Sequence, residues 1–87
     1  MAFDEKKDIK IAQHEVFITE NSKFVASVHR YDEGEMKLQL VRAYQDKSGV
    51  WQFGKLGRLN KDEILLLVRL INLVKEHFNI TEYIGVL

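Results

Sequence analysis

The residues best suited to bind a ligand are cations and aromatic rings that alternate through the middle of the chain. Cations can follow phosphates and flat rings can stack on bases, so this mixture is typical of proteins that bind single-stranded nucleic acid. Trp51 is the best stacking candidate, because it follows a polar turn in a segment that ends in Lys55. Phe53 and either tyrosine could equally belong to the core. We predict that the binding residues are Lys23, Arg30, Tyr31, Lys37, Arg42, Tyr44, Trp51, Phe53, Lys55 and Arg58.

The charge distribution permits such a surface, although the net charge of the chain is zero. Residues 21–58 hold seven basic and four acidic side chains, a net charge of +3, whereas residues 1–20 and 59–87 are net acidic. A local basic face can attract a polyanion even when the whole chain is neutral. We therefore expect a modest electrostatic contribution to binding.

No group of residues points to catalysis or to a metal site. The absence of cysteine excludes disulfides, thiolate zinc sites and cysteine nucleophiles. His14, His29 and His77 fall in separate predicted elements without carboxylates at ligand spacing, so we expect ordinary surface or half-buried histidines. Gly54 and Gly57 lack the spacing and the following residues of a phosphate loop. We predict a protein that is not an enzyme, with no catalytic residue, metal or cofactor.

The spacing of apolar residues predicts strands joined by short polar turns. Phe24, Ala26 and Val28 alternate with polar residues, as in a half-buried strand, and Val25 is the exception. Short turns connect neighbouring antiparallel strands, so we expect a four-stranded antiparallel meander. The predicted strands are 14–19, 23–31, 37–44 and 50–56.

One long helix should follow the strands. Asn60 can cap it, Glu63 completes a capping box, and Asn79 is a suitable stop after Phe78. The apolar residues cover more than the ~100° arc of a helix with one buried face. One stripe could cover the sheet: Ile64, Leu67, Val68, Ile71, Val74 and Phe78. The arc is widened further by Leu65, Leu66, Leu70 and Leu73.

The extra apolar arc predicts a homodimer. Burying each leucine is worth roughly 1.5–3 kcal/mol, and one sheet cannot readily cover both sides of a helix. A thicker core within one chain, with the C-terminal tail folded over the helix, is the alternative. We assign the dimer interface to Leu66, Leu70, Leu73 and Val74.

We interpret the chain as one α+β domain. Residues 1–12 are a charged, flexible lead-in, residues 13–79 are the binding domain, and residues 80–87 are an apolar tail that packs or recruits a protein partner. The N-terminus is too charged for a signal peptide, and the apolar run at 65–74 is far below the ~20 residues of a membrane span. We expect a cytoplasmic protein without membrane association, from a bacterium or a phage-infected cell, or a nuclear one if eukaryotic.

The order of these features, from about Phe17 to Val74, resembles the transcriptional positive-cofactor-four family of single-stranded-DNA-binding coactivators, which are Whirly-like and have phage and bacterial members. The resemblance rests on Ala-Ser-Val-His-Arg-Tyr at 26–31, Leu-Gln-Leu-Val-Arg-Ala-Tyr at 38–44, Gly-Lys-Leu-Gly-Arg-Leu at 54–59 and Asn-Lys-Asp-Glu at 60–63. It implies a curved sheet whose strands cradle unpaired DNA and a dimer formed by paired helices. Pur-type single-strand binders are a close second.

By position, the resemblance implies stacking by Tyr31 and phosphate contacts by Arg42 and Lys55. Gln45 departs from the family, which often has an aromatic residue there, and Trp51 could substitute. We therefore expect a single-stranded-DNA binder with little sequence preference, acting in transcription regulation, replication or recombination; RNA is left open. The alternative is a protein-interaction module that uses the helix for a different partner and binds no nucleic acid.

Overall fold

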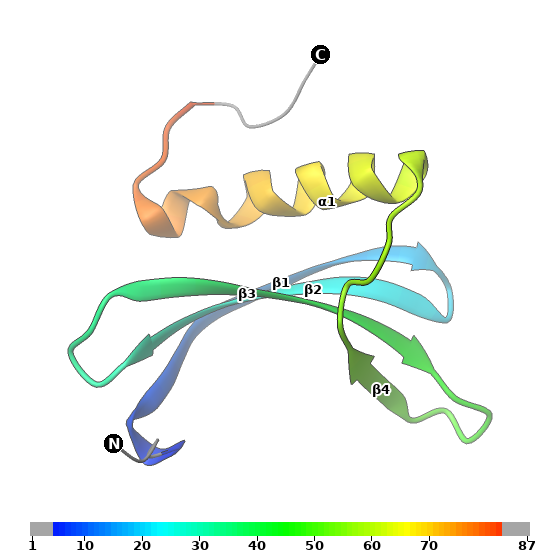
Figure 1. Ribbon diagram of the computed structural model, residues 1–87, viewed down its shortest axis with the longest axis horizontal. Coiled ribbons are helices and arrows are strands. Elements are labelled where there is room, and N and C mark those ends of the chain that lie inside the picture. The colour runs from blue at the N-terminus through cyan, green and yellow to red at the C-terminus, as the bar shows by residue number, and fades with distance from the viewer. Residues whose placement is uncertain (1–4, 83–87) are drawn as a thin grey trace.

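The computed structural model describes residues 5–82, which form a four-stranded antiparallel sheet and one helix (Figure 1). The strands lie side by side in the order of the chain, β1-β2-β3-β4, and α1 follows them. This architecture confirms the predicted α+β fold class. The bounds are β1 Asp8–Thr19, β2 Ser22–Tyr31, β3 Met36–Gln45, β4 Trp51–Gly54 and α1 Lys61–Val74, with short 3-10 helices η1 at Glu5–Lys7 and η2 at Lys75–Phe78.

Successive side chains of β2 point to the two faces of the sheet. Phe24, Ala26 and Val28 are fully buried in a core cluster with α1. Val25 points to the opposite face, where it lies beside Val41 of β3 in the register. Figure 1 shows α1 along one side of the sheet, and no element of residues 5–82 covers the other side.

The first strand is longer than predicted. It begins at Asp8, which corrects both the predicted start at His14 and the assignment of residues 8–12 to a flexible lead-in. A register shift between Lys10 and Ala12 interrupts the pairing with β2. Asp8, Ile9, Lys10 and Ile11 alternate between polar and apolar residues as a strand does, but all four are exposed, so the pairing with β2 and not burial places them in the sheet.

The helix begins at the predicted capping box. The backbone N–H of Glu63 donates to Oδ1 of Asn60 (2.8 Å), and the N–H of Asn60 donates to Oε1 of Glu63 (2.9 Å). The α-helical turns end at Val74, and η2 continues to Phe78. Asn79 adopts a left-handed conformation with φ 61°, which ends the helix as predicted. No helix of the described residues is long and apolar enough to cross a membrane.

The core corrects the predicted dimer interface. Leu70 and Val74 are 0% and 1% exposed, because they pack against Phe24 and Val28 of the same chain. Leu66 is partly buried against the same cluster. Residues four apart lie on one face of a helix, so α1 turns the row 66, 70 and 74 toward the sheet. Of the stripe predicted to cover the sheet, Leu67, Val74 and Phe78 also pack in this core, whereas Ile64 at its start is 48% exposed. Only Leu73 of the predicted interface is largely exposed, at 44%.

The predicted packing of the C-terminal tail concerns residues 80–87. The structure describes residues 80–82, where Ile80 is 38% exposed. Tyr83, Ile84, Val86 and Leu87, on which that prediction mainly rests, lie outside the described residues.

Candidate nucleic-acid interface

The sheet face opposite α1, here called the open face, carries half of the predicted binding residues. The strand register and the alternation of side chains place on it Lys10, Gln13, Glu15 and Phe17 of β1; Lys23, Val25, Ser27, His29 and Tyr31 of β2; Lys37, Gln39, Val41 and Ala43 of β3; and Trp51 and Phe53 of β4. Lys23, Tyr31, Lys37, Trp51 and Phe53 therefore share one surface.

Two aromatic rings and a cation meet at one end of the open face. The Nζ atom of Lys23 lies 4.3 Å from the ring centroid of Trp51 and 5.5 Å from that of Phe17. The two rings meet edge to face, with centroids 6.1 Å apart. This geometry allows cation–π attraction between Lys23 and both rings. Lys23 also forms an ion pair with Glu15 (2.9 Å), which partly offsets its charge.

Phe17 was missed by the sequence analysis, although its side chain is 51% exposed. In the sequence it stands between Val16 and Ile18, and such an apolar run suggests a buried residue. The register places it opposite Lys23, on the face away from α1, whereas its neighbours Val16 and Ile18 pack toward the core. The sequence offered one signal for this position: Phe17 has the opposite parity to His14, Val16 and Ile18, so in a strand it must point to the other face of the sheet.

Phe53 extends the aromatic surface toward the middle of the sheet. Its side chain is 62% exposed, although Ala43, its partner on β3, is fully buried. A depression of about 270 Å³ begins beside Phe53, with Val25 and Val41 among its lining residues and polar groups from Lys10, Gln13, Ser27, His29 and Gln39. A flat apolar ring beside polar donors and acceptors is suited to an unstacked base.

A chain of polar contacts lies at the far end of this depression. His29 Nε2 is 2.8 Å from Oγ of Ser27, and His29 Nδ1 is 3.5 Å from Oδ2 of Asp8. The first distance is a hydrogen bond, whereas the second becomes an ion pair only when the histidine is protonated. His29 also lines a neighbouring depression of about 510 Å³ together with Tyr31, Lys37, Asp8, Gly34 and Glu35. Lys37 could donate to a phosphate next to the Tyr31 ring, whereas the carboxylates of Asp8 and Glu35 could only accept from a base and would repel a phosphate.

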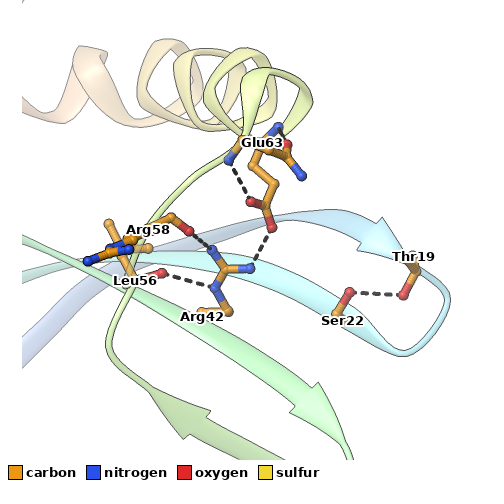
Figure 2. Close-up of polar contacts among 7 residues, drawn as sticks. Thr19, Ser22, Arg42, Leu56, Arg58 and Glu63 are labelled. Atoms are coloured by element: carbon orange, nitrogen blue, oxygen red, sulfur yellow. Dashed lines mark hydrogen bonds and ion pairs between the residues drawn. The ribbon is translucent and has the colours of Figure 1, made fainter.

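Arg42 lies on the other face of the sheet, where it holds the start of α1 in place. Figure 2 shows that its guanidinium donates to the carbonyl oxygens of Leu56 (3.0 Å) and Arg58 (3.2 Å) and to the carboxylate of Glu63 (2.5 Å). It also lies over the ring of Phe24, 5.1 Å from the centroid. All three nitrogens of the guanidinium donate to groups of the same chain. Arg42 therefore stabilises the fold, and its guanidinium is not available for the predicted phosphate contact.

The contact between Arg42 and Glu63 has a consequence for stability. The hydrogen bond from Arg42, followed by that from the Asn60 backbone, lowers the pKa of Glu63 from its usual value. A carboxyl whose pKa is lowered by folding stabilises the native state above its usual titration range, and this stabilisation is lost as the pH falls through the lowered pKa. The ion pair should therefore contribute at neutral pH and not in strong acid.

We expect Arg42→Gln to lower the melting temperature at pH 7, because it removes the charge partner of Glu63 and two bonds to the segment before α1. The difference from the wild type should shrink as the pH falls below the usual range of glutamate. Melting curves followed by circular dichroism at several pH values measure both effects. Arg30→Gln, at an exposed cation on β2, is the matched control. An equal loss in both variants, or a difference independent of pH, would contradict this role.

Of the remaining predicted residues, Arg30, Tyr44 and Arg58 lie away from the open face, and Lys55 lies at its border. Arg30 and Tyr44 point to the same side of the sheet as Arg42, and Tyr44 is 55% exposed there. Arg58 is exposed in the connection between β4 and α1. Lys55 begins that connection and lines a shallow depression with Phe53 at the edge of the sheet, so it lies next to the open face.

No model of a protein family, no curated protein and no solved structure matches this chain.

Proposed function

We propose that the open face binds single-stranded DNA with little sequence preference, during transcription, replication or recombination. The observation that carries this proposal is the aromatic surface of Phe17, Trp51 and Phe53 beside Lys23, on a face that no described element covers. Leaving large rings in water is unfavourable, so a group of them on one surface suggests a flat apolar ligand. Unpaired bases are such a ligand, and each stacked base contributes about 1–3 kcal/mol.

The arrangement of the face suggests how a strand would lie on it. Bases would stack at the Trp51 and Phe53 end and again at Tyr31, and the depression between them would hold the intervening nucleotides. Lys10, Lys23 and Lys37 would contact phosphates. A duplex hides its bases in the helical stack, so it could not use the rings, and it should bind more weakly than a single strand.

Titration of a fluorescently labelled oligo-dT, repeated with the matching duplex and with oligo-U, tests this proposal. We expect binding of the single strands and a weaker interaction with the duplex. The logarithm of the binding constant should decrease as the logarithm of the salt concentration increases. The slope should be about −2 if three lysines each neutralise one phosphate. Affinity for oligo-dT no better than about millimolar in low salt would reject the proposal.

Two lysine variants locate the electrostatic contribution. Lys37→Gln on the open face should reduce the salt slope by less than one unit, about −0.7 being expected per phosphate. Lys61→Gln makes the same change in charge at the start of α1, on the other side of the sheet, and should leave the slope unchanged. Equal slopes for the two variants would show that Lys37 does not contact the strand.

A homodimer is the second part of the proposal. The outer surface of α1 exposes Ile64, Leu65 and Leu73, which a second copy of the chain could cover. The same side chains favour the other candidate function, a protein-interaction module whose helix binds a different partner. That candidate would lead if oligonucleotide binding were absent.

A further inference from the structure

Two histidines from distant parts of the chain lie close together on the helix side of the sheet, beside the edge strand β1. His14 lies on β1 and points toward the helix side of the sheet, as does its register partner Ala26. His77 lies in η2, 63 positions later in the sequence. Their Nε2 atoms are 3.4 Å apart, and both side chains are partly buried.

The two rings meet through their nitrogen edges and not through their faces. The ring centroids are 5.6 Å apart, much farther than the two Nε2 atoms, and the ring planes are inclined by 44°. The nitrogens therefore point toward each other. A hydrogen bond can form only if one ring donates and the other accepts, and 3.4 Å is longer than the usual range of about 2.7–3.2 Å.

The separation does match that of two ligands on one metal ion. Zinc binds imidazole nitrogen at about 2.0–2.1 Å, and a tetrahedral angle then places two such nitrogens about 3.3–3.4 Å apart. We propose that His14 and His77 form a two-histidine site for a divalent transition-metal ion, with Zn²⁺ as the probe ion. The ion would lie beside the line that joins the two nitrogens, and each ring would turn modestly to direct its lone pair at it.

The surroundings define what kind of site this would be. Among the described residues, no group of three or more histidine, cysteine, aspartate and glutamate side chains could hold a metal ion, so His14 and His77 would be the protein ligands of the described chain. Water or a small ligand would complete the coordination. Imidazole is a good ligand for Zn²⁺, Cu²⁺ and Ni²⁺, and a pair of them should bind more weakly than a closed structural zinc site.

Metal binding at this position would join β1, an edge strand, to the C-terminal end of the helical segment. A metal ion that binds only the native state shifts the folding equilibrium toward that state. The two ligands are far apart in the sequence, so the ion would also cross-link a long segment of the chain. The site lies on the helix side of the sheet, so it is independent of the proposed DNA surface.

Thermal unfolding with and without Zn²⁺ tests the site. We expect Zn²⁺ at about a hundredfold excess over its dissociation constant to raise the melting temperature by at least about 5 °C. His14→Gln and His77→Gln should each abolish this rise. The compared quantity is the shift caused by Zn²⁺ within each variant, because either substitution also changes the stability of the metal-free protein.

His29→Gln is the matched control, since His29 lies on the open face and should not affect the shift. Isothermal titration calorimetry of the folded protein with Zn²⁺ should give one ion per chain and lose that signal in both site variants. An unchanged melting temperature and no calorimetric signal at millimolar Zn²⁺ would overturn the proposal. So would a shift that persists in His14→Gln and His77→Gln, or that disappears in His29→Gln.

Discussion

Replacing Leu70 with alanine should lower the free energy of unfolding by about 2–5 kcal/mol. Leu70 is fully buried between α1 and β2, where it contacts the cluster of Phe24, Val28 and Val74. The substitution removes apolar contacts and leaves a cavity that the sheet cannot easily close, because the strands are held by their hydrogen bonds. Urea denaturation followed by circular dichroism measures the change.

Leu65→Ala is the control, since it removes the same atoms from the same helix at a side chain that is 56% exposed. In a single chain it should change the free energy of unfolding by no more than about 0.5 kcal/mol. Equal losses for Leu70→Ala and Leu65→Ala at low protein concentration would show that the helix packs on the sheet with a different face. The comparison thus separates the core from the outer surface of α1.

The same surface tests the dimer. Sedimentation of the wild type at micromolar concentration should report twice the chain mass of 10.2 kDa if a second copy covers Leu65 and Leu73. Leu65→Lys should then sediment as a folded monomer, because a charged side chain cannot be buried there without a partner. A wild type that is already monomeric would reject the homodimer.

Replacing Phe53 with alanine should weaken binding of oligo-dT by about 5- to 150-fold, which corresponds to the loss of about 1–3 kcal/mol for one stacked base. The ring is 62% exposed, so its removal should barely change the melting temperature. Trp51 is less suited to this test, because its ring also contacts Phe17 and Lys23. Titrations and melting curves on the same preparation separate lost binding from lost folding.

Tyr44→Ala provides the matched control, since Tyr44 is a similarly exposed aromatic residue, 55%, on the other side of the sheet. We expect its affinity for oligo-dT to equal that of the wild type. A weaker affinity for Tyr44→Ala than for Phe53→Ala would move the binding surface to the helix side. If neither substitution changes the affinity, stacking at these positions is not part of binding.

Much of the fold could be predicted from local patterns. The turn between β3 and β4, the alternation along β2 and the capping box of Asn60 and Glu63 depend on residues close in the sequence, so their signals survive without tertiary information. The same holds for the stop at Asn79, where a side chain that tolerates the left-handed conformation ends the helix. The element order followed from these signals.

The candidate site was predictable only in part. Residue types suggested cations and rings, but they did not show which face of a strand each occupies. Arg42 and Tyr44 point to one side of β3 and Ala43 to the other, and a shift of the register by one residue would exchange them. β1 begins at Asp8, where Ile9 and Ile11 alternate with Asp8 and Lys10, so the sequence carried a signal for this start that the prediction did not use.

The remaining features depend on contacts between residues far apart in the sequence. Leu70 and Leu73 are equally apolar, and only the docking angle of α1 on the twisted sheet buries the first and exposes the second. The pairing of Arg42 with Glu63 and the approach of His14 to His77 arise from the same docking. Neither composition nor periodicity predicts these contacts, because they depend on how the helix packs on the sheet and not on either element alone.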